Sequence, residues 1–419
     1  MSKLKKVGAV RVPIILSVLS LITLWIAAIA PSGQTTIQIN SNDTTGSAGE
    51  VFRFANIVTS TAGSAWVTFA LTVIATALSW WLALTGRRAS RWLSIAFGLV
   101  FVFNILVSLF NAQTMTITAL LHGSLSLAVP LIFGSLAGVL SERVGLVNIA
   151  IEGQLLAGAF VSAMVATLAQ NAWVGLLGAM VAGAIVSWLL AVFAIRYVVD
   201  QIIIGVVLNV LIVGLTNFMF STFMSANPQL FNTPPRLPAV AIPGLAQIPV
   251  LGPVLFNQSP IVYLMFIAVA GVWFALYKTR WGLRLRAVGE YPKAADTVGI
   301  KVYATRYRSV MIGGALAGLG GAFFTIGQSL AFGKEMTNGA GYIALAALIF
   351  GRWNPIYAAF AGLLFGFAEN LQYSLSTIGS HVPSDFLLML PYLLTVVLVA
   401  GLVGKVTGPA AAGKAYIKS

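Results

Sequence analysis

Residues 172–195 read AWVGLLGAMVAGAIVSWLLAVFAI, twenty-four residues without a charged side chain. A helix that spans a bilayer needs about 20 consecutive, predominantly apolar residues. Comparable stretches recur along the whole chain, which is 59% hydrophobic and only 8% charged. A soluble domain needs more charge to keep its surface hydrated. The sequence therefore predicts an all-α fold, a polytopic bundle of transmembrane helices.

The other apolar runs set the number of predicted spans. One apolar segment, 341–350, is too short to cross as a straight helix, and it stops at the sequence Gly-Arg-Trp-Asn-Pro that ends at residue 355. We expect 341–355 to be half of a broken helix or a re-entrant turn. Depending on this segment, ten to twelve crossings are predicted. The full-length runs are 12–30, 62–85, 93–111, 117–140, 145–168, 172–195, 201–224, 259–277, 309–330, 356–377 and 385–403.

Basic residues predict the topology, because Lys and Arg collect in cytoplasmic loops. Loop 278–308 holds eight Lys or Arg residues against two acids, and basic residues also flank the first span and fill the C-terminal tail. Both termini are therefore expected in the cytoplasm. The charged pair Glu142 and Arg143 is expected at the lipid surface on the same side. This rule also accounts for the net charge of +14 without a nucleic-acid partner.

The N-terminal region is predicted to be a separate addition. The first apolar run ends in Ala28-Ile29-Ala30, which resembles a signal-peptidase site, but the run is longer than a usual signal core. We favour an uncleaved helix. Residues 1–60 then form an extra transmembrane helix with an external polar loop, 61–404 the transmembrane transport domain, and 405–419 a cytoplasmic tail.

Several kinds of chemistry are excluded by composition. The chain has no cysteine and two histidines, which rules out disulfides, thiolate sites and a histidine metal cluster. Residues 408–415, GPAAAGKA, almost match a phosphate-binding loop, but Ala415 lacks the hydroxyl group and no strand precedes the segment. We interpret it as a flexible tail, so the chain is expected to bind no ATP. No cluster of His, Asp or Ser indicates an enzyme.

A polar segment interrupts the apolar pattern at residues 141–154, SERVGLVNIAIEGQ. Gly145 and Gly153 permit a helix break, and irregular backbone at membrane depth is tolerated only where it is buried or lines a cavity. A carboxylate at that depth is functional by default. Asn148 and Glu152 therefore either lie on a translocation pathway or belong to a tight cytoplasmic turn.

Further polar side chains fall inside predicted spans. Each could hydrogen-bond a neighbouring helix, and together they suffice for a polar, uncharged pathway. Small residues in the same spans, such as Gly314-x-x-x-Gly318, favour close helix contacts. Besides Asn148 and Glu152, the candidate pathway residues are Asn209, Asn217, Gln328, Glu369 and Asn370, with Gln372 beside them.

The basic loop contains a second candidate site at residues 289–300, GEYPKAADTVGI. A proline at the first turn predicts a short amphipathic helix, and a glycine seven residues after it ends a helix well. Such a helix could dock a cytoplasmic partner, or it could be a solvated loop attracted to anionic lipid. The candidate coupling residues are Gly289, Glu290, Pro292, Ala294, Ala295 and Gly299.

Three segments together resemble permease subunits of the branched-chain amino acid, simple sugar and nucleoside class of ABC importers. They are 141–154, the segment 200–209 (DQIIIGVVLN) and the loop 282–300, and the likeness covers roughly 120–400. The resemblance implies two permease chains, identical or paralogous, in a bacterial cytoplasmic membrane. Two ATPase subunits, which would bind ATP and Mg, would dock on loop 289–300. An extracytoplasmic binding protein would deliver the substrate.

The resemblance also bears on the substrate. The Glu-Gly-Gln form of the first segment is most similar to permeases for nucleosides, with simple sugars next. The chain departs from the pattern in its N-terminal addition and in Ala150, where glycine is expected. An ion-coupled secondary carrier is the main alternative, and it would need more embedded charges than this sequence contains.

Overall fold

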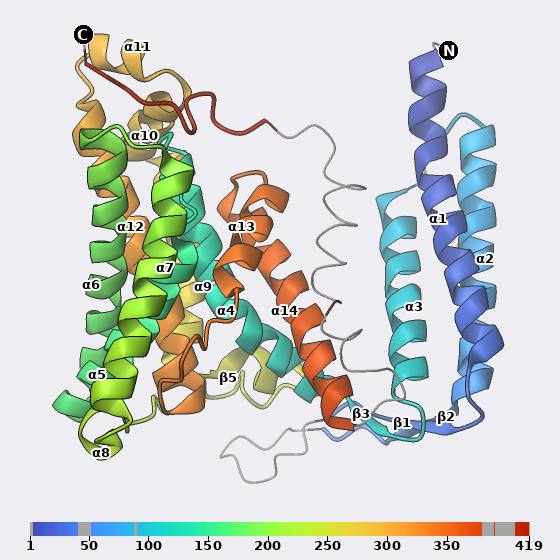
Figure 1. Ribbon diagram of the computed structural model, residues 1–419. Helices are drawn as coiled ribbons and strands as arrows, with labels where there is room; N and C mark the ends of the chain where they lie inside the picture. The colour runs from blue at the N-terminus through green and yellow to red at the C-terminus, as the bar shows by residue number, and fades with distance from the viewer. Residues whose placement is uncertain (1–2, 41–51, 88–89, 379–388, 390–406, 419) are drawn as a thin grey trace. The chain divides into compact units, whose positions relative to one another are not determined.

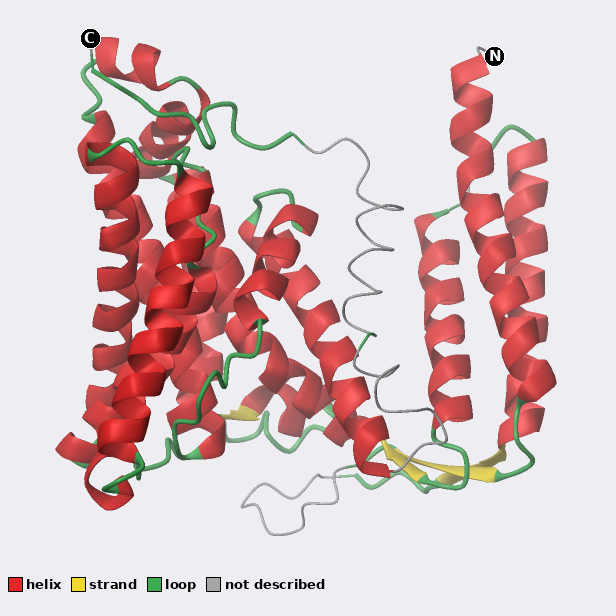
Figure 2. Ribbon diagram, viewed as in Figure 1, coloured by secondary structure: helices red, strands yellow, loops and turns green. Residues whose placement is uncertain are grey.

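A computed structural model describes residues 3–40, 52–87, 90–378, 389 and 407–418. Within these residues, nine helices are long and apolar enough to cross a membrane, which confirms the predicted polytopic helical fold (Figures 1 and 2). The predicted span 385–403 lies almost wholly outside the described residues. The chain divides into two compact units, Met1–Leu120 with Gln247–Pro253 and Gln372–Leu387, and Leu121–Ala246 with Val254–Leu371 and Leu388–Ser419. The predicted boundary at residue 60 stays a prediction.

The first unit contains three long helices, α1 (Lys3–Ile29), α2 (Thr61–Leu84) and α3 (Arg91–Leu109). α1 packs against α2, and α2 against α3. A seam of hydroxyl groups joins α1 to α2: Thr23 Oγ1 lies 2.9 Å from Thr72 Oγ1, and Ser20 Oγ lies 2.8 Å from Thr76 Oγ1. Such interhelical hydrogen bonds supplement van der Waals contacts where lipid provides no hydrophobic driving force.

A small sheet, which the all-α prediction missed, lies beside these helices. β1 (Gln34–Gln38) pairs antiparallel with β2 (Ile57–Ser60) and parallel with β3 (Thr114–Thr116). β1 and β2 come from the segment expected to be an external polar loop, whereas β3 lies between the predicted spans 93–111 and 117–140. β1 buries Thr35 and Ile37 on one face, the period-2 alternation of a half-buried strand.

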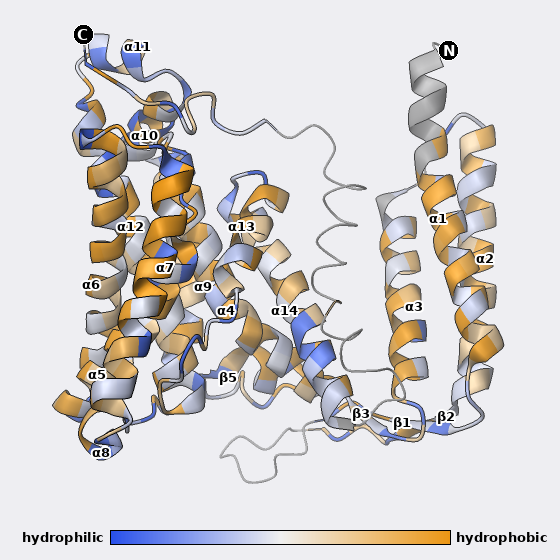
Figure 3. Ribbon diagram, viewed as in Figure 1, coloured by the Kyte–Doolittle hydropathy of each residue, from blue (hydrophilic) through white to orange (hydrophobic). Residues whose placement is uncertain are grey.

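The second unit is built from helices that are mostly more deeply buried than those of the first unit. Its full-length helices are α4 (Ile117–Glu142), α5 (Ile151–Ala169), α6 (Ala172–Ala191), α7 (Gln201–Met219), α9 (Pro260–Lys278) and α12 (Val302–Ala322). α6, α7 and α12 each continue into a π-helical turn, at Val192–Arg196, Phe220–Met224 and Phe323–Ser329. Figure 3 shows hydrophobic colour along most of these helices, as expected for segments that face lipid or one another.

Glycines set the closest contacts of this unit. A Cβ atom on Gly183 of α6 would lie 2.1 Å from Gly314 O of α12, and one on Gly158 of α5 would lie 2.4 Å from Gly318 O. Only residues without a side chain allow backbones this near to each other. The predicted Gly314-x-x-x-Gly318 pattern therefore lies where α12 meets both α5 and α6.

The remaining elements lie mostly in the second unit. α13 (Ala340–Phe350) is the short helix predicted near 341–355, and α14 (Pro355–Ile378) follows it after a turn. The loop after α7 contains α8 (Pro228–Phe231) and a hairpin of β4 (Val240–Ala241) and β5 (Asn257–Gln258). The basic loop forms α10 (Arg280–Glu290) and α11 (Pro292–Thr297). α14 is 24 residues long but carries Glu369, Asn370 and Gln372.

Candidate functional site at an interrupted helix pair

The chain leaves helical geometry between α4 and α5, over residues 143–150. Gly145 makes the turn with φ +87°, a conformation that favours glycine. α5 does not begin at the end of α4. A Cβ atom on Gly134 would lie 3.0 Å from Ile151 Cγ2, and Gly134 precedes the end of α4 by roughly two turns, about 12 Å. The non-helical segment therefore runs back alongside a membrane-spanning helix. The helix breaks at Gly145, as expected, whereas Gly153 lies inside α5.

One face of α7 supplies the hydrogen bonds that this segment cannot make for itself. Gln201 Oε1 accepts from Val147 N at 2.7 Å, and Asn209 Nδ2 donates to Ile149 O at 2.9 Å. Asn209 Oδ1 accepts from Gly153 N at 2.8 Å. Buried backbone groups need such partners, because no water replaces them in an apolar core. Asn209 thus supports the break, with both ends of its amide engaged.

Gly205 lies between those two amides on the same face of α7. A Cβ atom there would lie 3.0 Å from Ile149 Cβ, so the segment runs closely along the helix. Asp200 Oδ1 caps the start of α7 by accepting from Ile202 N at 2.8 Å. Gln201, Gly205 and Asn209 therefore contact the break or the start of α5, and Asp200 begins the helix that carries them, which explains the composition of segment 200–209.

Asn148 and Gln154 pair across the break. Asn148 Nδ2 donates to Gln154 Oε1 at 3.2 Å, and Gln154 Nε2 donates to Asn148 Oδ1 at 3.0 Å. Both side chains are completely buried. In this conformation the Asn148 side chain bonds Gln154 and Ser141 and faces no open path. Gln154 was not among the predicted site residues, although it stands in the same polar segment.

Glu152 binds the N-terminus of α13. Its Oε1 accepts from Thr337 Oγ1 at 2.6 Å and from Gly339 N at 2.9 Å, and its Oε2 accepts from Gly341 N at 2.6 Å. The first N–H groups of a helix have no partner within the helix, and the helix dipole favours a negative charge there. Glu152 is only 7% exposed. The short helix α13 therefore begins beside the first turn of α5.

The more accessible part of this cluster lies on α7, in the segment before α13 and in the first turn of α13. Tyr342 is 50% exposed, and its hydroxyl accepts from Asn209 Nδ2 at 3.2 Å. Asn217 Nδ2 donates to the exposed Glu335 Oε1 at 3.0 Å. Asn217 Oδ1 is buried, and the described part of the chain offers it no hydrogen-bond partner. These groups could meet a neutral polar solute.

The remaining pathway candidates lie apart from the cluster. Gln328 is exposed in the π-helical turn after α12. Asn370 lies against α4, where its Nδ2 donates to Ser124 Oγ at 3.3 Å. Glu369 is half-buried next to it on α14. No contact among the described residues joins these three side chains to Glu152.

The basic loop 278–308 has the short helix that was predicted for its candidate coupling residues. α11 begins at Pro292, and Gly299 follows its end with φ +83°. The exposed candidates are Glu290, Ala294 and Gly299, whereas Ala295 is only 3% exposed. A partner could therefore touch Ala294 and not Ala295, which packs inward.

Gly289 joins this loop to the break. A Cβ atom on Gly289 would lie 2.0 Å from Arg143 O, so α10 ends directly on the first residue of the non-helical segment. Glu142, expected at the lipid surface, is instead buried and accepts from Trp353 Nε1 at 2.5 Å. A buried carboxylate needs such a donor, and the indole of the α13–α14 turn supplies it.

The tail packs onto the same place, which differs from the flexible tail expected from residues 408–415. Ala411 N donates to Gly289 O at 2.9 Å, and Ala410 N donates to Glu290 Oε2 at 3.3 Å. Further along, the Tyr416 ring lies 5.4 Å from the Tyr303 ring, and Tyr416 is buried. Hydrogen bonds and one aromatic anchor fix residues 407–418 although their composition is that of a loop.

Comparisons with known proteins agree with this geometry. Residues 120–409 match the model of the family described as "Branched-chain amino acid transport system / permease component". The guanosine ABC transporter permease protein NupQ of Bacillus subtilis is 42% identical over 311 residues, covering 72% of this chain and 97% of that protein. The nucleoside ABC transporter permease protein NupC of Lactococcus lactis is 39% identical over 318 residues, covering 73% and 98%.

A third relative is described as a permease for a different class of solute. The putative glucose ABC transporter permease protein TsgC13 of Haloferax volcanii is 34% identical over 257 residues, covering 60% of this chain and 76% of that protein. No solved structure matched the chain. Permease components of this kind are multi-pass and not catalytic, and they act with an ATPase and a substrate-binding protein. The chain therefore belongs to the branched-chain amino acid transport system permease family, and it is the permease subunit of an ABC importer.

Proposed function

We propose that this permease carries nucleosides into a bacterial cell across the cytoplasmic membrane, with both chain termini in the cytoplasm. The observation that carries the proposal is the identity of 42% and 39% to permeases described for guanosine and for nucleosides, over almost their full length. A simple sugar is the second candidate, because a relative described for glucose is 34% identical.

The chemistry of the cluster supports a nucleoside. Nucleobases stack on aromatic rings, at about 1–3 kcal/mol per base, and amide side chains hydrogen-bond their edges. Tyr342 offers an exposed ring within reach of Asn209, and Asn217 Oδ1 is an acceptor without a partner among the described residues. A nucleoside is neutral and polar, which suits a site that holds amides and hydroxyls and few free charges.

The proposed assembly contains two permease chains, two ATPase subunits and an extracytoplasmic binding protein. The ATPase would contact the exposed face of α11 around Ala294. Its motion would pass from α10 through the contact of Gly289 with Arg143 to the non-helical segment, and so to Glu152 and the start of α13. Helices that start inside a span are typical of binding sites in transporters.

Uptake assays test the substrate. Cells that lack this gene would be given labelled guanosine, adenosine, uridine or glucose, with and without ATP depletion. We expect loss of ATP-dependent nucleoside uptake, and restoration by the wild-type gene. Tyr342→Ala should lower the apparent affinity for nucleosides about tenfold, since one stacking contact is lost, whereas Tyr342→Phe should keep most of it. Retained nucleoside uptake with lost glucose uptake would replace the proposal by the sugar permease.

A pair of substitutions tests the coupling contact. Ala294→Trp should leave the Tm of the purified complex unchanged while uncoupling ATP hydrolysis from transport, because this side chain faces outward. Ala415→Trp on the exposed part of the tail is the matched control. Ala295→Trp should lower the Tm, because the larger ring has to enter a buried site. Normal coupling in Ala294→Trp would remove α11 as the docking contact.

A further inference from the structure

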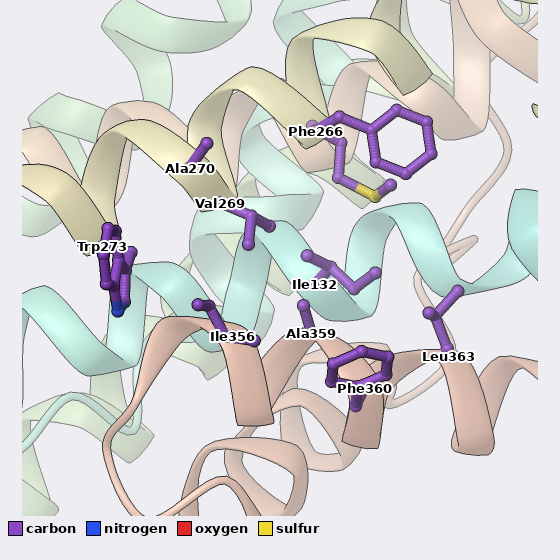
Figure 4. Close-up of a pocket in the computed structure, with 10 residues that line it drawn as sticks. Ile132, Phe266, Val269, Ala270, Trp273, Ile356, Ala359, Phe360 and Leu363 are labelled. Carbon is purple, nitrogen blue, oxygen red and sulfur yellow. The ribbon is translucent and has the colours of Figure 1, made fainter.

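A groove runs along the second unit between α9 and α14, outside the site described above. Its volume is about 380 Å³, and Figure 4 shows its side chains turned toward a shared space with Ile132 of α4 between the two rows. Every lining residue is apolar. α9 contributes Met265, Phe266, Val269, Ala270 and Trp273, and α14 contributes Ile356, Ala359, Phe360 and Leu363.

The groove opens to the exterior of the unit. Phe360 on its edge is 65% exposed and Phe266 is 37% exposed. Only 28% of the most apolar stretch of α9 is buried inside the chain, so most of this helix faces outward. α9 spans the bilayer, so water is not the solvent of this face. A hydrocarbon chain matches both its surroundings and its lining.

Positive charge gathers at one end of the groove. Trp273 is the last lining residue of α9, and Lys278 Nζ lies 5.8 Å from the centroid of its ring. At the same end, the exposed Arg352 precedes α14, and Arg143 Nε donates to Trp353 O at 3.0 Å. The acid Glu142 lies beside Arg143 in the sequence, and its side chain is buried against Trp353.

This end of the groove leads into the basic loop 278–308, which the positive-inside rule places at the cytoplasmic surface. That leaflet carries anionic lipids, and basic pockets between transmembrane helices bind their headgroups. Tryptophan commonly marks the headgroup level. An apolar groove with cations at its headgroup end is complementary to one kind of molecule, which has a hydrocarbon tail and a negative head.

We propose that this groove is a specific site for an anionic phospholipid, with one acyl chain between α9 and α14 and the phosphate at Lys278 and Arg352. The site is independent of the transported solute. It differs from the general lipid contact of a membrane protein because it is selective for the headgroup. The exposed ammonium of Lys278 and guanidinium of Arg352 provide this selectivity, since they attract a zwitterionic headgroup less strongly than an anionic one.

Lipid retention measured by native mass spectrometry tests this site. The full-length permease, in complex with its ATPase, would be delipidated in detergent and exposed to equal amounts of phosphatidylglycerol and phosphatidylcholine. We expect a preference for phosphatidylglycerol that falls about fivefold in Lys278→Gln and again in Arg352→Gln. Lys293→Gln removes an exposed cation of α11 outside the groove and should leave the preference unchanged.

The groove itself is tested by filling it. Ala359→Trp should abolish retention of both lipids, whereas Ile267→Trp, an exposed position of α9 outside the groove, should not. Lys278→Gln lies on the surface, so it stays informative if Ala359→Trp does not fold. Equal retention of the two lipids by the wild type, or unchanged preference in both charge variants, overturns the proposal. So does loss of permease–permease pairing in Ala359→Trp, since a second permease chain would then occupy the groove.

Discussion

The two units both bury polar side chains inside apolar helices, but these side chains satisfy different needs. In the first unit, hydroxyl pairs such as Thr23 with Thr72 join two continuous helices. Each hydroxyl also lies within hydrogen-bond distance of a carbonyl of its own helix, Thr23 Oγ1 at 2.8 Å from Ser20 O and Thr72 Oγ1 at 2.7 Å from Phe69 O. Because each hydroxyl has one proton, one of the pair donates to the other hydroxyl while the other donates to its own helix. In the second unit, Glu152 and Asn209 hold backbone groups that helix breaks have left without partners.

This difference sets the expected cost of losing each side chain. A hydroxyl of the first unit can be replaced without stranding a backbone group, because the helices around it are intact. Removing an acceptor in the second unit strands buried N–H groups, each at about 1–3 kcal/mol. Polar residues at helix breaks should therefore matter far more than polar residues between intact helices.

The largest effect is expected at Glu152. Glu152→Ala removes the acceptor of three donors, Thr337 Oγ1, Gly339 N and Gly341 N, so roughly 3–6 kcal/mol of stabilisation should be lost at the start of α13. Hydrogen exchange of residues 337–342 in the purified protein would measure it, and transport should be abolished.

The isosteric variant Glu152→Gln is the matched control. Its carbonyl oxygen can replace Oε1, but its amide group would face the Gly341 N–H, so the loss should be smaller than in Glu152→Ala. Slow exchange at 337–342 in Glu152→Ala would contradict the capping role and, with it, the contrast between the units.

Sequence alone predicted one side of this arrangement. The polar segment between two apolar runs allowed a helix break near Glu152, with a tight cytoplasmic turn as the alternative, and the length of 341–350 indicated a short helix or a re-entrant turn. Their contact was not predictable, because nothing in the local pattern of Glu152 identifies the helix start, almost 190 residues later, that it caps. Three sequence segments carried the family resemblance. The structure explains segments 200–209 and 282–300, because residues of both contact the first segment at residues 143–153.

Other features escaped prediction for different physical reasons. The β1–β3 sheet is made of strands of three to five residues in a polar region, too short for a clear periodic pattern. The tail has the composition of a loop, and its place depends on long-range partners of Ala411 and Tyr416. The difference in exposure between Ala294 and Ala295 was not predictable, because a six-residue helix is too short for its sequence to show which face is buried.

An intermediate effect is expected at Asn209. Asn209→Leu keeps a similar volume but removes the acceptor of Gly153 N and the donor to Ile149 O, so we expect about 2–4 kcal/mol of destabilisation. The Tm of the purified permease should fall, and exchange at residues 147–153 should quicken. Val210→Leu, at the exposed neighbouring position, is the control for a change in α7 alone. If Asn209→Leu behaved like this control, the break would be held by other contacts.

The smallest effect is expected at Thr72 in the first unit. Thr72→Val removes one hydroxyl from the seam and leaves a side chain of the same shape, while Thr23 Oγ1 still donates to Ser20 O. Interhelical hydrogen bonds in membranes average about 0.6 kcal/mol, so the Tm should change little. A double-mutant cycle with Thr23→Val isolates the coupling energy of the pair. A coupling energy as large as the cost of Asn209→Leu would mean that the hydroxyl seam stabilises the first unit as strongly as the amides stabilise the break. The distinction between intact and interrupted helices would then no longer predict which buried polar groups matter.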